Sequence, residues 1–463
     1  MVAVLAAGTT PVEAAAPRAT RATVTAARHD ARASARPRAR TKPYVHRISR
    51  NGRYFLDQRG RPILVKGDSP WAILVDASVA RMNRYVAIRS RQGFNAALVS
   101  LLGNTANGGP SDSGATYDGV RPFVGGDPSR LNGRYWDRVA NFMRRCLRAG
   151  ITVMAYPLDG WTGTPDYDGL AQSWSTAQAR AYGRAVAHRL RRFPNVVWAV
   201  GGDFSSARPD IDPRFNAVLK GLARGGMKRP STIQFTLNQT SFDSPYWARR
   251  IGFSFAYAYA PSYTIVQSSY QHRTPAHRHV PTIMGEAHYE DYPGVTNLYL
   301  RSQAAWALTS GAAGEFYGSE DVWDAAPTRR HLRTRAVGQL SALRRVFGRL
   351  PGWPQLVPDF GSRFIRGGRG DKGSDDGEYY SGNTYVTGGI TRRGTLAVVY
   401  LPDAARAVTL ATGRMRRGYT AHWVDPTNGA RHAARTGTTY RRARANAAGG
   451  PDWLLVLQAR ARR

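Results

Sequence analysis

The sequence predicts a (β/α)₈ barrel followed by a smaller all-β domain, and three observations support this expectation. About eight short apolar runs recur between residues 63 and 317, helical patterns separate them, and helical patterns stop after Pro351. A length of 463 residues suits one large barrel with one accessory domain. We therefore expect an N-terminal arm at residues 1–43, a catalytic barrel at residues 44–352 and a β-sandwich at residues 353–463.

The first 43 residues resemble a shortened secretion signal followed by a basic arm. Val2–Ala6 is a short apolar stretch and Val12–Ala14 resembles a small-residue cleavage site, whereas the basic start of a signal peptide is missing. From Ala15 to about Lys42 the composition is Ala, Arg, Thr and Pro without an apolar period, which is typical of disorder. We expect a secreted, extracellular bacterial protein with a truncated signal peptide and no membrane span.

The barrel strands are expected where the chain is continuously apolar, as in parallel strands that are covered on both faces. The runs are Ile63–Lys66, Ala96–Leu101, Ile151–Tyr156, Val196–Val200, Thr232–Leu237, Phe253–Tyr257, Thr282–Met284 and Ala312–Tyr317.

Helices are expected between these strands. Ser78 is a candidate N-cap, Gly93 and Gly150 are candidate helix ends, and the last long helix should run from about Arg329 to Gly348.

The chain after Pro351 shows short strands and no helical period. The expected strands are Leu396–Leu401, Ala407–Leu410, Ala421–Val424 and Trp453–Leu457, with a turn at Asn428-Gly429.

The charge is strongly basic, with a formal net charge of +35 and a pI of about 11.1. Three explanations remain open: nucleic acid binding, attraction to an acidic polysaccharide or cell wall, and arginine use imposed by a GC-rich genome. Arg residues are scattered and no aromatic-interleaved nucleic-acid motif occurs, so we expect no specific nucleic acid partner. We expect a monomer that binds a polysaccharide or oligosaccharide, and the basic charge allows that this glycan is acidic.

A single cysteine, Cys146, excludes an intrachain disulfide and a thiolate zinc site. It lies on the apolar face of an expected helix, which favours a buried, inert thiol. His272, His277 and His279 share a loop without an obvious carboxylate partner, so we expect no metal and no cofactor.

Polar and aromatic residues follow directly after the expected strands, where the active sites of such barrels lie. Carboxylates, amides and large rings supply acid/base groups, hydroxyl partners and stacking faces, which together indicate a sugar site. We expect the following residues to bind substrate: Asp68, Trp71, Asn104, Asp159, Asn238, Gln239, Tyr259, Tyr289, Glu290, Tyr317 and Trp323.

Two carboxylates are the candidate catalytic residues. Asp203 follows the fourth strand after Gly201-Gly202, and Glu286 follows the seventh strand after Gly285. Strands four and seven lie on opposite sides of a barrel mouth, and glycoside hydrolysis needs a carboxylic acid and a carboxylate facing each other. The alternative is that one of them is a buried ion-pair partner of an arginine. Glu315, inside the last strand, is expected to form such an ion pair.

Several stretches resemble the apiosidase-like glycoside hydrolase family and occur in the same order. They are VKGDSPW (65–71), GFNAALVS (93–100), VVWAVGGDF (196–204), IMGEAHYED (283–291) and WALTSGAAGEFYGSEDVW (306–323). WVDPTNG (423–429) and DWLLVL (452–457) resemble the collagen-binding-type β domain of that family. The resemblance extends from about residue 45 to the end of the chain.

The resemblance implies that Asp203 is the acid/base and Glu286 the nucleophile of a retaining double displacement on a plant or microbial polysaccharide. Asp203 must then start protonated, so its surroundings should be drier, or closer to another carboxylate, than those of Glu286. The family often has a histidine near the end of strand five, whereas this chain has Thr236, Asn238 and Gln239, so the sugar is not implied.

Two other functions compete with hydrolysis. A non-catalytic glycan-binding barrel would keep the aromatic residues and lose a carboxylate, and a nucleic acid or wall-adhesion protein would cluster its arginines. Both carboxylates are present and the arginines are scattered, so the sequence favours a glycosidase.

Overall fold

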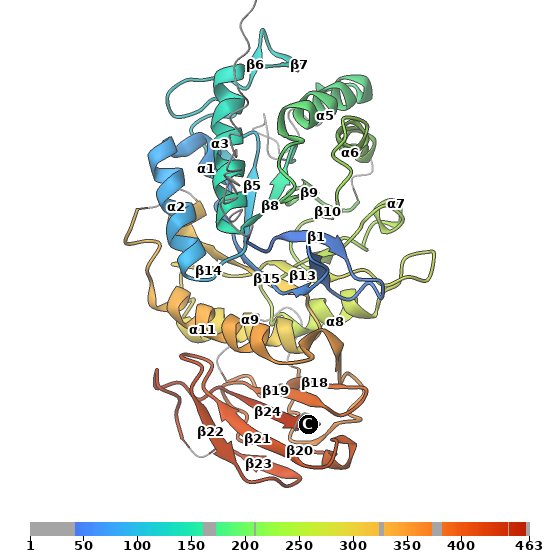
Figure 1. Ribbon diagram of the computed structural model, residues 1–463, viewed down its shortest axis with the longest axis vertical. Helices are drawn as coiled ribbons and strands as arrows, with labels where there is room; N and C mark the ends of the chain where they lie inside the picture. The colour runs from blue at the N-terminus through green and yellow to red at the C-terminus, as the bar shows by residue number, and fades with distance from the viewer. Residues whose placement is uncertain are drawn as a thin grey trace, which may run out of the picture. The chain divides into compact units, whose positions relative to one another are not determined.

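The structure is a computed structural model, and it describes residues 42–160, 173–207, 210–323, 328–372, 382–442 and 444–459 (Figure 1). The arm expected at residues 1–43 lies outside the described residues except for its last two positions.

In the described part of the chain, eight parallel strands form a nearly closed barrel whose spatial order follows the sequence. At the seam, β10 and β12 lie side by side, and the Gly252 amide donates to the Ser231 carbonyl at 2.7 Å. The strands are β4 (Val65–Asp68), β5 (Ala96–Ser100), β8 (Thr152–Tyr156), β9 (Val196–Gly201), β10 (Ser231–Gln234), β12 (Ser254–Tyr257), β13 (Thr282–Glu286) and β15 (Gly314–Ser319).

Every expected apolar run contributes a strand, with ends shifted by a few residues. The difference that matters most for the site is in the fifth strand, which was expected to reach Leu237 but ends at Gln234. Beyond Gln234 the chain leaves the sheet: the Thr236 amide donates to the Phe204 carbonyl at 3.0 Å, and Asn238 has a φ of 62°. This early exit places Gln234 at the barrel rim.

The helices follow their expected capping signals. Ser78 caps α2, accepting from the Arg81 amide, and Gly150 ends α3 with a φ of 75°. The last helix begins later than expected, because the Thr334 side chain accepts from the Val337 amide and fixes the start there. The long helices are α2 (Val79–Arg91), α3 (Gly133–Ala149), α5 (Thr176–Leu190), α6 (Asp212–Arg224), α8 (Tyr263–Gln271), α9 (Asn297–Thr309) and α11 (Arg335–Arg349).

Short elements complete the barrel. The hairpin of β1 (Val45–Ile48), β2 (Phe55–Asp57) and β3 (Pro62–Ile63) covers the N-terminal end of the strands, where the Val45 amide donates to Thr152 Oγ1 at 2.8 Å. β11 (Gln239–Thr240) and β14 (Tyr289–Glu290) extend the sheet at the opposite rim. Among the described residues, no helix combines the length and the apolar character needed to cross a bilayer.

After α11 the fold changes to antiparallel sheets, so the expected fold class is confirmed. One sheet has the order β16-β18-β19-β24-β21-β22 and the other β17-β20-β23. The strands are β16 (Leu356–Pro358), β17 (Ile365–Gly367), β18 (Thr387–Thr391), β19 (Leu396–Leu401), β20 (Ala407–Leu410), β21 (Tyr419–Val424), β22 (Arg431–Ala434), β23 (Thr439–Arg441) and β24 (Trp453–Ala459).

Helix α9 joins the barrel to these sheets. All residues from Leu300 to Thr309 are buried, on every side of the helix, and Figure 1 shows α9 and α11 between the barrel strands and β19 with β24. Arg301 pairs with Asp452 at 2.6 Å, and the Trp306 indole donates to the Tyr385 carbonyl at 3.0 Å. The β domain thus covers a barrel helix that has no solvent face.

Two expectations about buried side chains are confirmed. Cys146 is buried in the helical layer of the barrel. Glu315 forms a buried ion pair with Arg344, whose guanidinium also donates to the Gly67 carbonyl at 3.1 Å.

Candidate active site

The chain turns sharply after β9 and so places Asp203 at the barrel rim. Gly201, Gly202 and Asp203 have φ angles of 90°, 107° and 56°. A Cβ on Gly201 would lie 2.1 Å from the Gln234 carbonyl oxygen, so only glycine fits beside β10. A non-glycine residue with a positive φ is uncommon and gathers at functional sites. Of the five such residues in the described part of the chain, Asp203 is the one that lines the pocket described below.

Glu286 is the last residue of β13 and lies in the same pocket as Asp203. Gln234 Nε2 donates to its Oε2 at 2.6 Å, and the Tyr289 hydroxyl donates to its Oε1 at 3.1 Å. The Trp71 indole donates to the same Tyr289 hydroxyl at 3.0 Å. Each carboxylate oxygen is therefore held by one donor, and Trp71 fixes the tyrosine that holds Oε1.

Burial raises the pKa of Glu286 to about 8, and the nearby charge of Asp203 adds to this effect. The hydrogen bonds from Tyr289 and Gln234 act in the opposite direction, because they stabilise the ionised form. Among the described residues neither Glu286 nor Asp203 pairs with an arginine, lysine or histidine. No described cation therefore offsets the burial that raises the pKa of both carboxyl groups.

Asp203 keeps one oxygen available. Its Oδ1 is buried and has no hydrogen-bond partner among the described residues. Burial also raises the pKa of Asp203, opposed by hydrogen bonding from the Thr236 side chain and the Leu237 backbone. An unpartnered buried oxygen with a raised pKa can carry a proton into the pocket.

The expectation that Asp203 occupies the drier of the two environments is wrong for the protein without substrate. The larger upward shift belongs to Glu286, for which burial is the main cause. The physical reason is position: Glu286 ends a barrel strand among the rings of Trp71, Tyr257 and Tyr289, whereas Asp203 lies in the loop after β9.

The pocket around the two carboxylates has a volume of about 250 Å³. Its remaining walls are aromatic and amide side chains, with one further carboxylate, and the described lining contains no arginine or lysine. These residues are Trp71, Ala106, Asn107, Gln234, Tyr257, Tyr259, Tyr289, Tyr292, Glu320 and Trp323. Tyr259 is held from behind by a stacked His288 ring at 4.6 Å. The site offers ring faces and hydrogen-bonding groups to a neutral polar ligand.

Of the expected substrate-binding residues, four line this pocket: Trp71, Tyr259, Tyr289 and Trp323. The other seven do not line it, and they fall into three groups.

Asp68 lies behind the pocket in a fully buried ion pair. Its carboxylate accepts from Arg89 Nε at 2.7 Å and from the Tyr85 hydroxyl at 2.6 Å, and its exposed fraction is 0%. A carboxylate enclosed in this way supports the helix α2 and is not accessible to a sugar.

Asn104, Asp159, Glu290 and Tyr317 belong to buried networks beneath the rim. Asn104 Nδ2 donates to Asp159 at 3.3 Å, and both side chains are 0% exposed. Tyr317 donates to Glu290, which also accepts from Thr334 Oγ1 at 2.8 Å. These residues hold the loops of the rim in place from below.

Asn238 and Gln239 lie further along the loop after β10. Asn238 is exposed and Gln239 Oε1 accepts from the Ser206 amide at 3.0 Å. Their displacement from the pocket follows from the early end of β10, which gives the position at the strand end to Gln234.

The sequence analysis missed Gln234, Tyr257, Asn107 and Tyr292 as lining residues. A signal existed for Gln234, since a polar amide inside the apolar run Thr232–Phe235 is unusual for a strand interior. A similar signal existed for Tyr257, whose side chain carries a polar hydroxyl at the end of the apolar strand β12. Asn107 ends the short 3₁₀ helix Thr105–Asn107 and Tyr292 lies in the turn after β14, and the sequence pattern does not determine the path of either segment.

Comparisons with known proteins agree with this geometry. A family model described as "Apiosidase-like, catalytic domain" matches residues 49–357. A comparison with curated proteins finds no significant match.

Two solved structures are similar to the chain along most of its length. One, described as a glycoside hydrolase, has a TM-score of 0.73 at 18% identity and covers 91% of this chain and 98% of its own. The other, a glycoside hydrolase family 5 protein from Bacteroides vulgatus, has a TM-score of 0.72 at 18% identity and covers 90% of this chain and 94% of its own. At this identity they show the fold. The family match spans more than half of the sequence, so the chain belongs to the apiosidase-like family and is a glycoside hydrolase.

Proposed function

We propose that the chain is a retaining glycosidase in which Glu286 is the nucleophile and Asp203 the acid/base. The observation that supports this most directly is that two carboxylates lie in one pocket without an ion-pair partner among the described residues. Glu286 accepts hydrogen bonds from two donors, and Asp203 has one oxygen without a partner. A carboxylate fixed at both oxygens is suited to attack along one direction, and a free carboxyl oxygen is suited to moving a proton.

In the first step a Glu286 oxygen attacks the anomeric carbon and the glycosidic bond breaks. Asp203 gives its proton to the departing oxygen, so the products are a glycosyl ester on Glu286 and a free alcohol. In the second step Asp203 takes a proton from water, the hydroxide attacks the anomeric carbon, and Glu286 leaves as a carboxylate. The two steps together restore the starting state, with the proton on Asp203 and Glu286 ionised.

Substrate binding must place that proton on Asp203. The hydrogen bonds from Gln234 and Tyr289 favour the ionised form of Glu286. Hydrogen bonds from Thr236 and Leu237 act on Asp203 in the same direction, but its Oδ1 has no donor among the described residues. A glycosidic oxygen placed near Oδ1 accepts a hydrogen bond only from protonated Asp203. The bound substrate therefore selects the productive protonation state.

The substrate in the pocket is a neutral terminal sugar unit. A volume of about 250 Å³ is below the roughly 300–1,000 Å³ of drug-sized sites, so it suits one sugar ring. A lining with three carboxyl groups and no described arginine or lysine disfavours a negatively charged sugar at this position. The family name makes apiose the first sugar to test. We propose that the protein acts outside the cell, where such polymers occur.

The decisive experiment follows the anomeric proton of the first-formed product by NMR. Retention is expected, and inversion would recast Glu286 as the base that activates water. Azide should rescue Glu286→Ala and give a glycosyl azide of inverted configuration. Asp203→Ala should cleave only substrates with good leaving groups and accumulate the glycosyl ester, visible by intact mass spectrometry. Absence of hydrolysis across a broad polysaccharide panel, with intact binding, would instead indicate a glycan-binding protein.

A further inference from the structure

A second pocket lies entirely within the β domain. It has a volume of about 330 Å³ and shares no lining residue with the active site. Strand β16, the end of β18 and the short helix η3 (Thr412–Arg414) form its sides. Three arginines, Arg363, Arg392 and Arg414, line it together with Phe360.

The positive charge of this pocket is not neutralised. All three arginines are exposed, and none of them forms an ion pair with a carboxylate in the described ranges. The one acidic residue in the lining, Asp359, is buried and already bound: it accepts from Arg369 at 2.7 Å and from backbone amides that include Ile365 at 2.7 Å. Three guanidinium groups therefore remain available to an anion.

An apolar face stands beside these charges. Val357 is 38% exposed, which is unusual for a strand residue of this size. Phe360 is half-buried and packs edge-on against Tyr270 at 5.7 Å, so its ring cannot turn freely. A fixed ring next to guanidinium groups matches a sugar acid, whose ring has an apolar face and whose carboxylate pairs with arginine in a bidentate manner.

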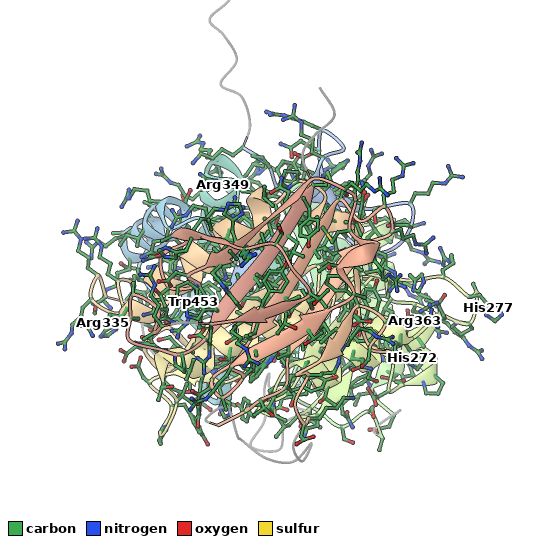
Figure 2. The ribbon with its side chains drawn as sticks, turned by 90° about the horizontal axis from the view of Figure 1, so that it is seen from below. His272, His277, Arg335, Arg349, Arg363 and Trp453 are labelled. Carbon is green, nitrogen blue, oxygen red and sulfur yellow. The ribbon has the colours of Figure 1, made fainter. Side chains whose placement is uncertain are left out.

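The positive field continues onto the neighbouring barrel surface. The pKa of Arg53 is lowered to about 10, mainly by burial, and the like charges of Arg273 and Arg392 contribute. Figure 2, which views the protein from the end where the β domain lies, shows Arg363 on the same side as His272 and His277. A negatively charged polymer that enters the pocket would also meet the charges of Arg53 and Arg273.

We propose that this β-domain pocket binds a segment of an acidic oligosaccharide, with uronate carboxylates on Arg363, Arg392 and Arg414 and a sugar face on Phe360. The choice of a glycan over other anions rests on the proposed function. The described lining of the active-site pocket has no arginine or lysine, so an acidic segment of a polymer would find its charge partners elsewhere on the surface. A nucleic acid fits less well, because single strands need a row of stacking rings, and of the two rings in this lining Phe364 is fully buried and only Phe360 is accessible.

The test measures binding separately from hydrolysis. Glu286→Gln protein of full length is titrated by calorimetry with an oligogalacturonate of five residues and with its fully methyl-esterified form. We expect binding of the acidic oligomer and at least tenfold weaker binding of the neutral ester. Arg392→Gln/Arg414→Gln should weaken binding of the acidic oligomer at least tenfold. The matched control, Arg435→Gln/Arg441→Gln, removes two exposed charges of the same domain outside the pocket and should stay within about twofold.

Three outcomes would overturn the proposal. Equal losses in the pocket variant and the control would show bulk attraction only. Equal binding of the methyl ester would remove the role of charge. Tighter binding of a single-stranded or duplex DNA of similar charge would assign the pocket to nucleic acid. Inverted or absent hydrolysis with normal oligogalacturonate binding would reject the proposed catalytic mechanism and leave the pocket assignment standing.

Discussion

Two pairs of barrel carboxylates contrast sharply in their surroundings. Asp68 and Glu315 are buried against Arg89 and Arg344, which neutralise them. Asp203 and Glu286 share a pocket without a described cation, and the charge of Asp203 raises the pKa of Glu286.

The difference does not reflect a shortage of cations, because the chain has 66 Lys and Arg residues against 31 Asp and Glu. Buried charge is unfavourable unless it is paired. Arginine forms ion pairs with the carboxylates that support the barrel, and no described arginine pairs with those that face the pocket. A carboxylate left unpaired in so basic a protein therefore marks a place where stability is given up for chemistry.

The largest effect is expected from changing Asp203 or Glu286, the carboxylates without an ion-pair partner in the described ranges. Glu286→Gln keeps the shape and removes the nucleophile, so kcat should fall by at least about a thousandfold. The fold should persist, because an amide can still accept one hydrogen bond. Turnover of an activated aryl glycoside measures the loss, and circular dichroism verifies the fold. Retained activity in a pure sample would assign the nucleophile to another residue.

Changing the paired carboxylates should affect stability and spare the chemistry. Asp68→Asn leaves Arg89 buried without a counter-charge, which costs about 3–5 kcal/mol, and Glu315→Gln should act similarly through Arg344. Denaturant titration measures the cost, and activity per folded molecule should stay within a few-fold. If Asp68→Asn instead lost activity at unchanged stability, Asp68 would be a substrate contact, as the sequence pattern suggested.

The raised pKa of Glu286 should also affect how the stability of the protein depends on pH. Because the pKa of Glu286 in the folded protein is raised to about 8, its contribution to stability is fully present below the unfolded pKa of about 4.3 and is lost as pH rises through 8. Glu286→Gln should therefore gain stability over the parent as pH rises from 4.5 to 8, by a few kcal/mol at about 1.4 kcal/mol per pKa unit. Melting temperatures at several pH values measure this.

A control with constant charge sharpens the pH test. Arg441→Gln removes an exposed side chain of the β domain, far from the pocket, so its difference from the parent should be flat. A Glu286→Gln difference that is equally flat would mean that Glu286 is ionised in the folded protein at low pH as well.

The smallest effect is expected from the donors that hold Glu286. Tyr289→Phe removes a hydrogen bond that stabilises the ionised carboxylate, so the pKa of Glu286 should rise further. The kcat/KM profile should then move toward higher pH, with a rate loss of about tenfold at its optimum. Tyr292→Phe, which changes another lining tyrosine, should leave the profile in place. Identical profiles for the parent and Tyr289→Phe would limit Tyr289 to packing.

Much of the fold could be predicted from the sequence, because barrel strands and helix caps depend on local patterns. The apolar runs, Ser78 and Gly150 carry their signals within a few residues. The pairing of Asp203 with Glu286 in one pocket followed from their positions after strands four and seven, which the barrel geometry brings to one rim.

The substrate-binding residues were harder to predict, because a position after a strand does not determine where its side chain points. Asp68 and Trp71 are close in the sequence, yet Asp68 turns toward Arg89 and Trp71 lines the pocket. The ion-pair partner of Asp68 is Arg89 in helix α2, and Glu290 accepts a hydrogen bond from Thr334, 44 positions later. Such long-range partners leave no trace in a single sequence.

The burial of α9 on all sides has a consequence for how the protein is made. Arg301 finds its partner in Asp452, which is 151 positions later in the chain. During synthesis α9, the helix before the last barrel strand, therefore lacks its partner Asp452 and keeps an uncovered apolar surface until β24 has left the ribosome. A nascent chain that ends before β24 should remain a client of chaperones and should be cut readily by proteases in α9. The order of translation thus makes the closing strand of the β domain the step that completes the barrel.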